Sequence, residues 1–263
     1  MMNTRTGAGI LGDPRIGRLI SISTAGSATN MAVDQAILNA VSQSGIPVLR
    51  FYQWVEPTLS LGYFQGLASR SDHCQSDQIR CVRRTTGGGA IVHDRELTYS
   101  ISMPVPAGQA GPRSALYQQT HAAIASALAC FGVHAVPFRL TGTGARSESE
   151  NSHFLCFQRR TPEDLIVSGY KVLGSAQRKS RTAVLQHGSL LMHASEYAPQ
   201  LPGVSDLLSV PITADDLIPG IVANLSECLG VDWQAGHLSE QEKLDAEQIS
   251  CERFSQSGWT ARR

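Results

Sequence analysis

The sequence predicts a mixed α/β (α+β) fold in which mixed β-sheets are flanked by helices. Short apolar runs typical of strands are interspersed with longer segments of helical period, and they do not alternate regularly as in a doubly wound βαβ fold. The chain has 263 residues, so a single domain could bury roughly three quarters of its unfolded surface in one large core. No internal repeat is present.

The N-terminal half predicts one helix and several short strands. Residues 1–20 have no periodic pattern, so we expect a flexible tail before a single domain over residues 21–263. Apolar residues recur every four positions in Asn30–Val41, which favours an amphipathic helix. Strands are expected at Pro47–Tyr52, Thr58–Tyr63, Ile79–Arg84, Ala90–Val92 and Thr98–Met103.

The C-terminal half predicts a long helix, a hairpin and two terminal helices. Ala-rich Ala115–Phe131 is expected to be helical, with Gly132 as its C-terminal cap. A hairpin is expected at Leu165–Ser175 and a strand at Ala183–Met192, and helices from about residue 213 close the chain. Two capping signatures support these helices, Thr213 with Asp216 and Ser239 with Glu242. Loops are expected at Gly108–Pro112 and Thr141–His153.

Composition excludes several classes of protein. The 22 basic and 22 acidic residues balance, which argues against nucleic acid and membrane as partners. No segment approaches the ~20 apolar residues of a membrane span, and the N-terminus lacks the apolar stretch of a signal peptide. None of the six cysteines forms a CxxC pair, so we expect free thiols in a cytoplasmic enzyme rather than a zinc ribbon.

Cys156 and Lys171 are the strongest catalytic candidates. They stand on either side of the Ser168-Gly169 turn, so a hairpin can bring the two side chains together. An ammonium beside a thiol favours the thiolate, which is the nucleophilic form. This pairing predicts an acyl-transfer enzyme that works through a thioester.

A triple glycine between two expected strands is the second candidate. In Arg83–Ala90 (RRTTGGGA), Gly87, Gly88 and Gly89 allow the backbone to approach a ligand closely. Exposed N–H groups there could hold a carbonyl, carboxylate or phosphate, and a plain turn is the alternative.

Histidines and arginines near these motifs have ordinary explanations. We interpret His93, next to Asp94, as a structural histidine, and His187 as a satisfied core histidine rather than a catalytic one. A metal site at His187 and His193 is rejected because no third ligand stands at a useful spacing. A basic cluster would suit an acidic protein partner beside the hairpin: Arg159, Arg160, Arg178, Lys179 and Arg181.

Several ordered blocks together resemble the lipoate/biotin protein ligase superfamily from about Asn30 to Leu208. The blocks are Asn30-Met31-Ala32 with Asp34, LRFYxW from Leu49, SLGYxQ from Ser60, RRxTGGGA from Arg83, KxxGSAQ from Lys171 and QHGS from Gln186. The resemblance implies a catalytic domain related to biotin protein ligases and class II tRNA synthetases. It also implies attachment of an octanoyl or lipoyl group to a lysine of a small carrier domain.

Within the superfamily, the chain is most similar to the cysteine-dependent octanoyltransferases. Cys156-Phe157 lies fifteen residues before Lys171, as in those enzymes, and the block His93–Ser100 (HDRELTYS) resembles theirs. Only about 55 residues follow Leu208, fewer than many ligases use for an accessory domain. The triple glycine is instead ligase-like, because these transferases usually carry Gly-Gly-Arg there.

The resemblance implies a role for each site residue. Cys156 would be the acyl-thioester nucleophile, and Lys171 would favour its thiolate and contact the acyl carbonyl. The expected substrate-binding residues are Arg84, Thr86, Gly87, Gly88, Gly89, His93, Gly174, Ser175, Ala176, His187 and Gly188. The strands around Leu59, Leu61 and Ile91 are expected to form the acyl tunnel.

The resulting hypothesis is an octanoyltransferase that needs neither metal nor cofactor. Its donor would be octanoyl-acyl carrier protein. Its acceptor would be a lipoyl-carrier domain, such as the glycine-cleavage H protein or a 2-oxoacid dehydrogenase subunit. One alternative is an ATP-dependent lipoate-protein ligase, which would use ATP and Mg²⁺. Others are an amidotransferase that moves octanoyl between carrier domains and a binding module without catalysis.

Overall fold

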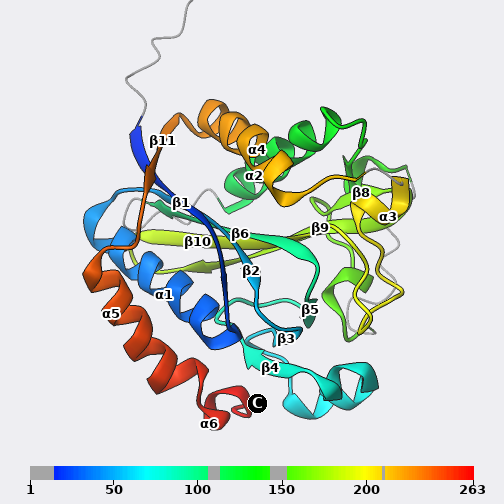
Figure 1. The fold of residues 1–263 in the computed structure, drawn as a ribbon, viewed down its shortest axis with the longest axis horizontal. Coiled ribbons are helices and arrows are strands. Elements are labelled where there is room, and N and C mark those ends of the chain that lie inside the picture. The colour runs from blue at the N-terminus through cyan, green and yellow to red at the C-terminus, as the bar shows by residue number, and fades with distance from the viewer. Residues whose placement is uncertain (1–14, 106–112, 143–152, 209–210) are drawn as a thin grey trace, which may run out of the picture.

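The computed structural model describes residues 15–105, 113–142, 153–208 and 211–263. Its centre is an eight-stranded mixed sheet in the order β11-β1-β2-β6-β10-β9-β8-β7 (Figure 1). β1 is parallel to both β2 and β11, whereas β6, β10, β9, β8 and β7 are joined by antiparallel pairings. The strands are β1 (Arg15–Ala25), β2 (Val48–Trp54), β6 (Glu96–Pro104), β7 (Val136–Pro137), β8 (Leu165–Val167), β9 (Tyr170–Lys179), β10 (Ala183–Leu191) and β11 (Val231–Gly236).

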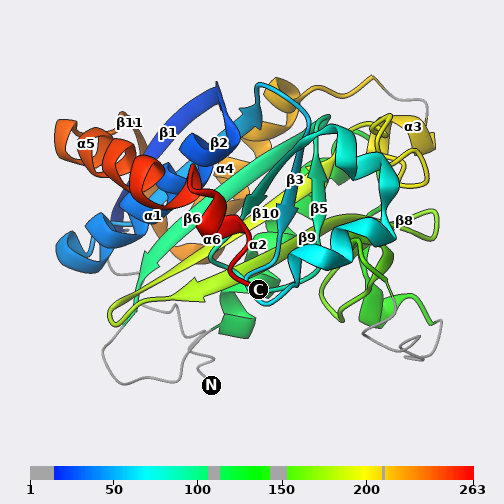
Figure 2. The same cartoon turned by 90° about the horizontal axis from the view of Figure 1, so that it is seen from below.

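A second sheet of three strands lies at one end of the large one (Figure 2). Its central strand β3 (Thr58–Leu61) is parallel to β4 (Arg80–Arg83) and antiparallel to β5 (Ile91–His93). The triple glycine connects β4 to β5. β3 is fully buried, with Leu59 and Leu61 at 0% exposure, so the glycine loop is attached to a well-packed sheet.

Helices cover both faces of the large sheet (Figure 1). α1 (Ser27–Ser44) and α5 (Glu240–Ile249) pack on one face, around a core that includes Ile37 and Leu185. α2 (Arg113–Ala129) and α4 (Ala214–Leu229) pack on the other, around a core that includes Leu128 and Leu173. The shorter helical elements are α3 (Val204–Leu208), α6 (Ser257–Thr260), η1 (Leu67–Asp72), η2 (Cys74–Gln78), η3 (Phe138–Leu140), η4 (Cys156–Gln158) and η5 (Ser250–Phe254).

The local signals in the sequence are confirmed. Both predicted capping boxes form, at Thr213 with Asp216 and at Ser239 with Glu242. Gly132 adopts a φ of 76° just after α2, as a C-terminal glycine should. The hairpin turns where expected, since Ser168 and Gly169 have φ values of 49° and 83°.

Two expectations were wrong at the edge of the large sheet. The predicted tail over residues 1–20 is too long, because β1 begins at Arg15. β11 was not predicted between the two C-terminal helices. Both strands are half-exposed, so their apolar pattern is weak. The expected loop at residues 108–112 and most of that at 141–153 lie outside the described residues. No helix in the described ranges is long and apolar enough to cross a membrane.

Candidate active site

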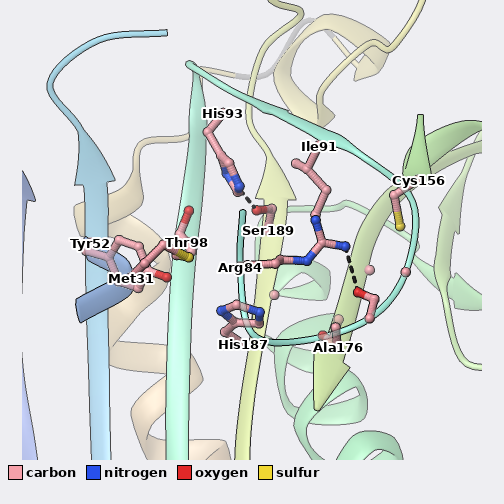
Figure 3. A pocket seen from close by; sticks show the side chains of 15 residues that line it. Met31, Tyr52, Arg84, Ile91, His93, Thr98, Cys156, Ala176, His187 and Ser189 are labelled. Atoms are coloured by element: carbon pink, nitrogen blue, oxygen red, sulfur yellow. Dashed lines mark hydrogen bonds between the residues drawn. The ribbon is translucent and has the colours of Figure 1, made fainter. Parts of the chain in front are cut away.

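A pocket with about 410 Å³ of empty space, part of it open to solvent, lies where the two sheets meet. Figure 3 shows Cys156 on one side of it and Met31, Tyr52 and Thr98 on the opposite side. The remaining lining comes from the glycine loop and three strands, with Arg84, Gly87, Gly88, Ile91, His93, Gly174, Ser175, Ala176, His187, Gly188 and Ser189. The thiol of Cys156 therefore lies at one side of the pocket.

Backbone hydrogen bonds hold Cys156 against the glycine loop. Its N–H donates to the carbonyl of Ala90 at 2.7 Å, and the N–H of Ala90 donates to the carbonyl of Phe154 at 3.1 Å. Gly89 makes this close approach possible, since a Cβ there would lie 3.0 Å from the Cα of Cys156. The nucleophile candidate is thus fixed by the segment that carries the triple glycine.

Lys171 lies beside Cys156, as the hairpin predicted. Its Nζ is 3.8 Å from the Sγ of Cys156 and donates to the carbonyls of Cys156 and Arg159 at 3.2 and 3.3 Å. On the other side, Nζ lies 2.8 Å from the Oδ2 of Asp164, and both side chains are almost fully buried. The sequence analysis did not identify Asp164.

The charged form of Lys171 is favoured in this setting. Burial acts against the ammonium, but the Cys156 sulfur and the Asp164 carboxylate outweigh it and raise the pKa of Lys171 above its ordinary value. A lysine that stays protonated can stabilise a thiolate by charge but cannot serve as the base that forms it. The ammonium has three N–H bonds, and the carbonyls of Cys156 and Arg159 and the carboxylate of Asp164 already accept from them, which leaves little capacity for an acyl carbonyl in this arrangement.

Arg84 braces the glycine loop from inside. Its guanidinium donates to the carbonyls of Gly87 and Gly89 at 2.7 Å each and to the carbonyl of Ser60 at 2.8 Å. Burial is the main reason why the pKa of Arg84 falls to about 10, which still leaves it charged at neutral pH. With the loop carbonyls turned towards Arg84, the N–H groups of Gly87, Gly88 and Gly89 donate to no residue in the described part of the chain.

His187 connects the glycine loop to a buried charge network. Its Nε2 lies 2.7 Å from the Oγ1 of Thr86, and its Nδ1 lies 3.4 Å from the Oδ2 of Asp34. Asp34 also pairs with Arg50 at 2.8 Å and accepts from Tyr52 at 2.9 Å. Burial would raise the pKa of Asp34, but the bond with His187 and the charge of Arg50 together lower it.

His93 lines the pocket but is held in a structural way. Its Nδ1 lies 2.6 Å from the Oε1 of Glu96, and its ring stacks on Trp54 with centroids 3.9 Å apart. Burial lowers the pKa of His93 against the opposing effect of Glu96. Its carboxylate partner is therefore Glu96, to which the backbone N–H of the neighbouring Asp94 also donates, at 2.7 Å.

A buried chain of hydrogen bonds ends at Ser175 in the pocket, and its more distant members were not predicted. The Nδ1 of His121 lies 2.7 Å from the carbonyl of Glu163, so it donates there, and Nε2 is left to accept from the Oγ of Ser175 at 2.6 Å. The Oγ of Ser175 also lies 2.6 Å from the hydroxyl of Tyr99, which accepts from Gln186 at 3.0 Å. Burial is the main cause that lowers the pKa of His121 to about 4, so its ring is neutral at pH 7.

Most of the predicted site residues therefore gather in one place, with a few exceptions. Thr86 and Gly89 support the loop rather than line the pocket. Leu59 and Leu61, expected in an acyl tunnel, instead form the core of the small sheet, and of that trio only Ile91 reaches the pocket. In the described ranges, no cluster of His, Cys, Asp or Glu could hold a metal ion.

The expected basic cluster does not form one surface. Arg159 bonds to the carbonyl of His153, and Arg160 lies over the ring of Phe138. Arg178 instead lies over Tyr63, on the other side of the hairpin. Successive residues of β9 face opposite sides of the sheet, which separates side chains that are close in sequence.

Comparison with known proteins identifies the family of the chain. The family model of the lipoyl protein ligase A/B catalytic domain matches residues 27–241. The octanoyltransferase LipM of Kyrpidia tusciae is 31% identical over 88% of this chain and 94% of its own length. That of Clostridioides difficile is 30% identical over 86% of this chain and 92% of its own.

Solved structures share the fold at lower identity. A lipoate-protein ligase A bound with ATP has a TM-score of 0.75 and 21% identity, over 94% of this chain and 98% of that one. A bi-partite lipoate protein ligase from Thermoplasma acidophilum has a TM-score of 0.74 at 21% identity, covering 94% of this chain and 96% of its own. Because the family model matches most of the chain, the chain is a member of the lipoyl protein ligase A/B catalytic domain family.

Proposed function

We propose that this enzyme transfers octanoyl from a thioester donor, octanoyl-acyl carrier protein, to a lysine of a lipoyl-carrier domain through Cys156. One observation carries the proposal: a thiol lies 3.8 Å from a buried ammonium at the side of an apolar pocket. Relatives named octanoyltransferase LipM, similar over most of their length, support the choice of acyl group.

The first half of the reaction would be a thioester exchange. The thiolate of Cys156, stabilised by Lys171, attacks the carbonyl carbon of the donor thioester. A bond forms between that carbon and the Sγ of Cys156, the bond to the donor sulfur breaks, and the donor leaves as a thiolate that takes up a proton. Gly89 lies against the backbone of Cys156, and the free N–H groups of the triple glycine would stabilise the negative oxygen of the intermediate.

The second half would be aminolysis. The neutral amine of the acceptor lysine attacks the octanoyl carbonyl, the new C–N bond forms, and the bond to Cys156 breaks. The amine loses one proton, and Cys156 returns as the thiolate beside Lys171. Since a thioester is converted into a more stable amide, the sequence of steps is downhill without ATP or another cofactor.

The pocket has a suitable shape for an acyl chain. Across from Cys156 its wall includes Met31 and Tyr52, and Ile91 also lines the pocket; all three offer mostly carbon surface. Tyr52 turns its hydroxyl away to Asp34, at 2.9 Å, so its ring rather than its polar end can face the chain. Burying a methylene group contributes about 0.8 kcal/mol of binding free energy, which would favour an acyl chain that fills the pocket.

An ATP-dependent ligase is the second candidate, favoured by the triple glycine with its unpaired N–H groups, which could hold a phosphate. The two are separated by supplying a lipoyl domain with either octanoyl-acyl carrier protein alone or free octanoate with ATP and Mg²⁺. We expect acylation of the lipoyl domain only with the first mixture. Acylation only with the second would overturn the transferase and support the ligase.

A further inference from the structure

Four arginines gather around three aromatic rings at the C-terminal end of the described chain. We call this group the arginine–aromatic cluster: Tyr63, Phe64, Trp259, Arg178, Arg253, Arg262 and Arg263. The guanidinium of Arg262 lies 4.6 Å from the ring centroid of Tyr63 and 4.5 Å from that of Trp259. Arg178 and Arg263 lie 5.4 and 6.0 Å from the Tyr63 centroid, so three guanidiniums surround one ring.

The cluster borders the active-site pocket. α6, which carries Trp259, lies against β4 of the small sheet (Figure 1). Buried Arg83 at the end of β4 donates to the carbonyl of Thr260 at 2.7 Å and to that of Gly62 at 2.9 Å. The ring of Phe64 lies 3.9 Å from where a Cβ on Gly87 would stand, and Gly87 lines the pocket.

No Asp or Glu side chain in the described part of the chain pairs with the arginines of the cluster. Elsewhere, Arg18, Arg50, Arg70, Arg80 and Arg139 each pair with a carboxylate. Among the described residues, no ion pair involves any arginine of the cluster. Burial is the main cause that lowers the pKa of neighbouring Arg83, and the charges of Arg262 and Arg263 lower it further. In a chain with a formal net charge of zero, this is a local excess of cations.

The arginines of the cluster are not needed to hold α6 in place. The Nε1 of Trp259 donates to the carbonyl of Arg83 at 2.8 Å, and Arg83 holds the other side of the helix through Thr260. Phe64 is 70% exposed although it is a large apolar ring beside the pocket. Arginine and aromatic side chains presented together on a surface are typical of protein-binding hot spots.

We propose that the arginine–aromatic cluster is the docking site for the acidic surface of the donor carrier protein. This inference rests on the proposed function. A donor that brings its acyl group on a phosphate-containing arm is anionic and complements the four guanidiniums. The acceptor must instead present a lysine, which a concentration of positive charge beside the pocket would repel. Arg253, Arg262 and Arg263 lie beyond residue 241, where the family match ends.

The test compares a charged with a neutral donor on the double variant Arg262→Gln/Arg263→Gln. Acylation of Cys156 is followed by mass spectrometry with octanoyl-carrier protein and with octanoyl-N-acetylcysteamine, which has neither phosphate nor protein. We expect the apparent second-order rate with the carrier protein to fall about tenfold or more at low salt. The rate with the small donor should stay within about twofold, because Cys156 and Lys171 are unchanged.

A charge-matched control separates docking from net charge. Arg15→Gln/Lys243→Gln removes two positive charges outside the cluster and should leave both rates unchanged. Arg178→Gln should reproduce part of the loss and keeps the test valid if the double variant folds poorly. Equal rates for the double variant and the wild type with the carrier protein would overturn the inference.

The second half-reaction tests whether the cluster binds the acceptor domain instead of the donor carrier protein. Preloaded octanoyl-enzyme is mixed with a lipoyl domain, and the rate of acyl loss is measured for the wild type and the double variant. We expect equal rates, and a slower rate for the variant would overturn the inference in favour of the acceptor. If the wild type takes octanoyl from neither donor, the proposed function itself fails. If it takes octanoyl from both donors while the double variant loses nothing with the carrier protein, only the docking inference fails.

Discussion

Lys171 forms a buried ion pair with Asp164, with 2.8 Å between Nζ and Oδ2. The carboxylate and the Cys156 sulfur face the same ammonium, so Asp164 helps to fix both the position and the charge of the group beside the thiol. Asp164 is itself anchored, since its Oδ2 accepts from the N–H of Thr161 at 2.6 Å and its Oδ1 from the hydroxyl of Tyr117 at 3.3 Å.

Asp164→Asn should weaken both stability and reactivity. Removing one partner of a buried pair leaves the other charge uncompensated, which typically costs about 3–5 kcal/mol of unfolding free energy. The ammonium is then easier to deprotonate, so the pH profile of Cys156 acylation should change on its alkaline side. Chemical denaturation and single-turnover kinetics measure the two effects. The neighbouring Glu163→Gln is the control, and equal losses in both variants would refute a special role for Asp164.

Lys171→Met should slow the reaction of Cys156 with iodoacetamide at pH 7–8. The thiolate is the reactive form, and the substitution removes the cation 3.8 Å from its sulfur. Alkylation is followed for the peptide that contains Cys156, because Cys74, Cys130 and Cys251 are also exposed. Lys243→Met on exposed α5 is the control. An unchanged rate would mean that the ammonium does not activate the thiol.

Gly174→Ala should displace Lys171 while leaving the sheet in place. A Cβ at Gly174 would lie 2.6 Å from the Cε and 2.9 Å from the Nζ of Lys171, closer than unbonded atoms can approach. We expect acylation of Cys156 to fall at least about tenfold and stability to fall by about 1–3 kcal/mol, as for other overpacked sites. Gly66→Ala meets nothing within 4 Å and should behave as the wild type. Full activity of Gly174→Ala would show that the position of Lys171 is not critical.

The enzyme should lose stability between about pH 6.5 and pH 4. Burial lowers the pKa of His121 from 6.5 to about 4, so the unfolded chain binds a proton in this range and the folded one does not. The free energy of unfolding therefore decreases as the pH is lowered, by about 3 kcal/mol in total for this group. His93, whose pKa is also lowered by burial, acts in the same direction.

Urea titrations from pH 7.5 to 4.5 test this dependence. In His121→Gln the fall in stability should be smaller than in the wild type. His134→Gln alters an exposed histidine and should follow the wild type throughout. If His121→Gln and the wild type lose stability in parallel, His121 is not the group responsible.

The sequence was informative where function depends on local geometry. Cys156 and Lys171 are fifteen residues apart, and a turn that favours positive φ between them was enough to predict that they meet. The triple glycine was found for the same reason, because its conformational freedom is visible in the residue type itself. The capping boxes and Gly132 were likewise readable without tertiary information.

Contacts between distant segments could not be predicted in this way. Asp164 reads as an ordinary turn residue, and its pairing with Lys171 depends on an irregular register between β8 and β9. His121 comes from α2 and reaches Ser175 only because that helix packs across β9. The arginine–aromatic cluster unites residues from positions 63, 178 and 262, which no local pattern relates.

The most direct test is the intact mass of the protein after mixing with octanoyl-acyl carrier protein in the absence of ATP. The proposed mechanism predicts a gain of one octanoyl group that hydroxylamine removes, that Cys156→Ala abolishes, and that a lipoyl domain discharges. A protein that gains no octanoyl group, yet acylates the lipoyl domain when given ATP and free octanoate, would contradict a thioester at Cys156.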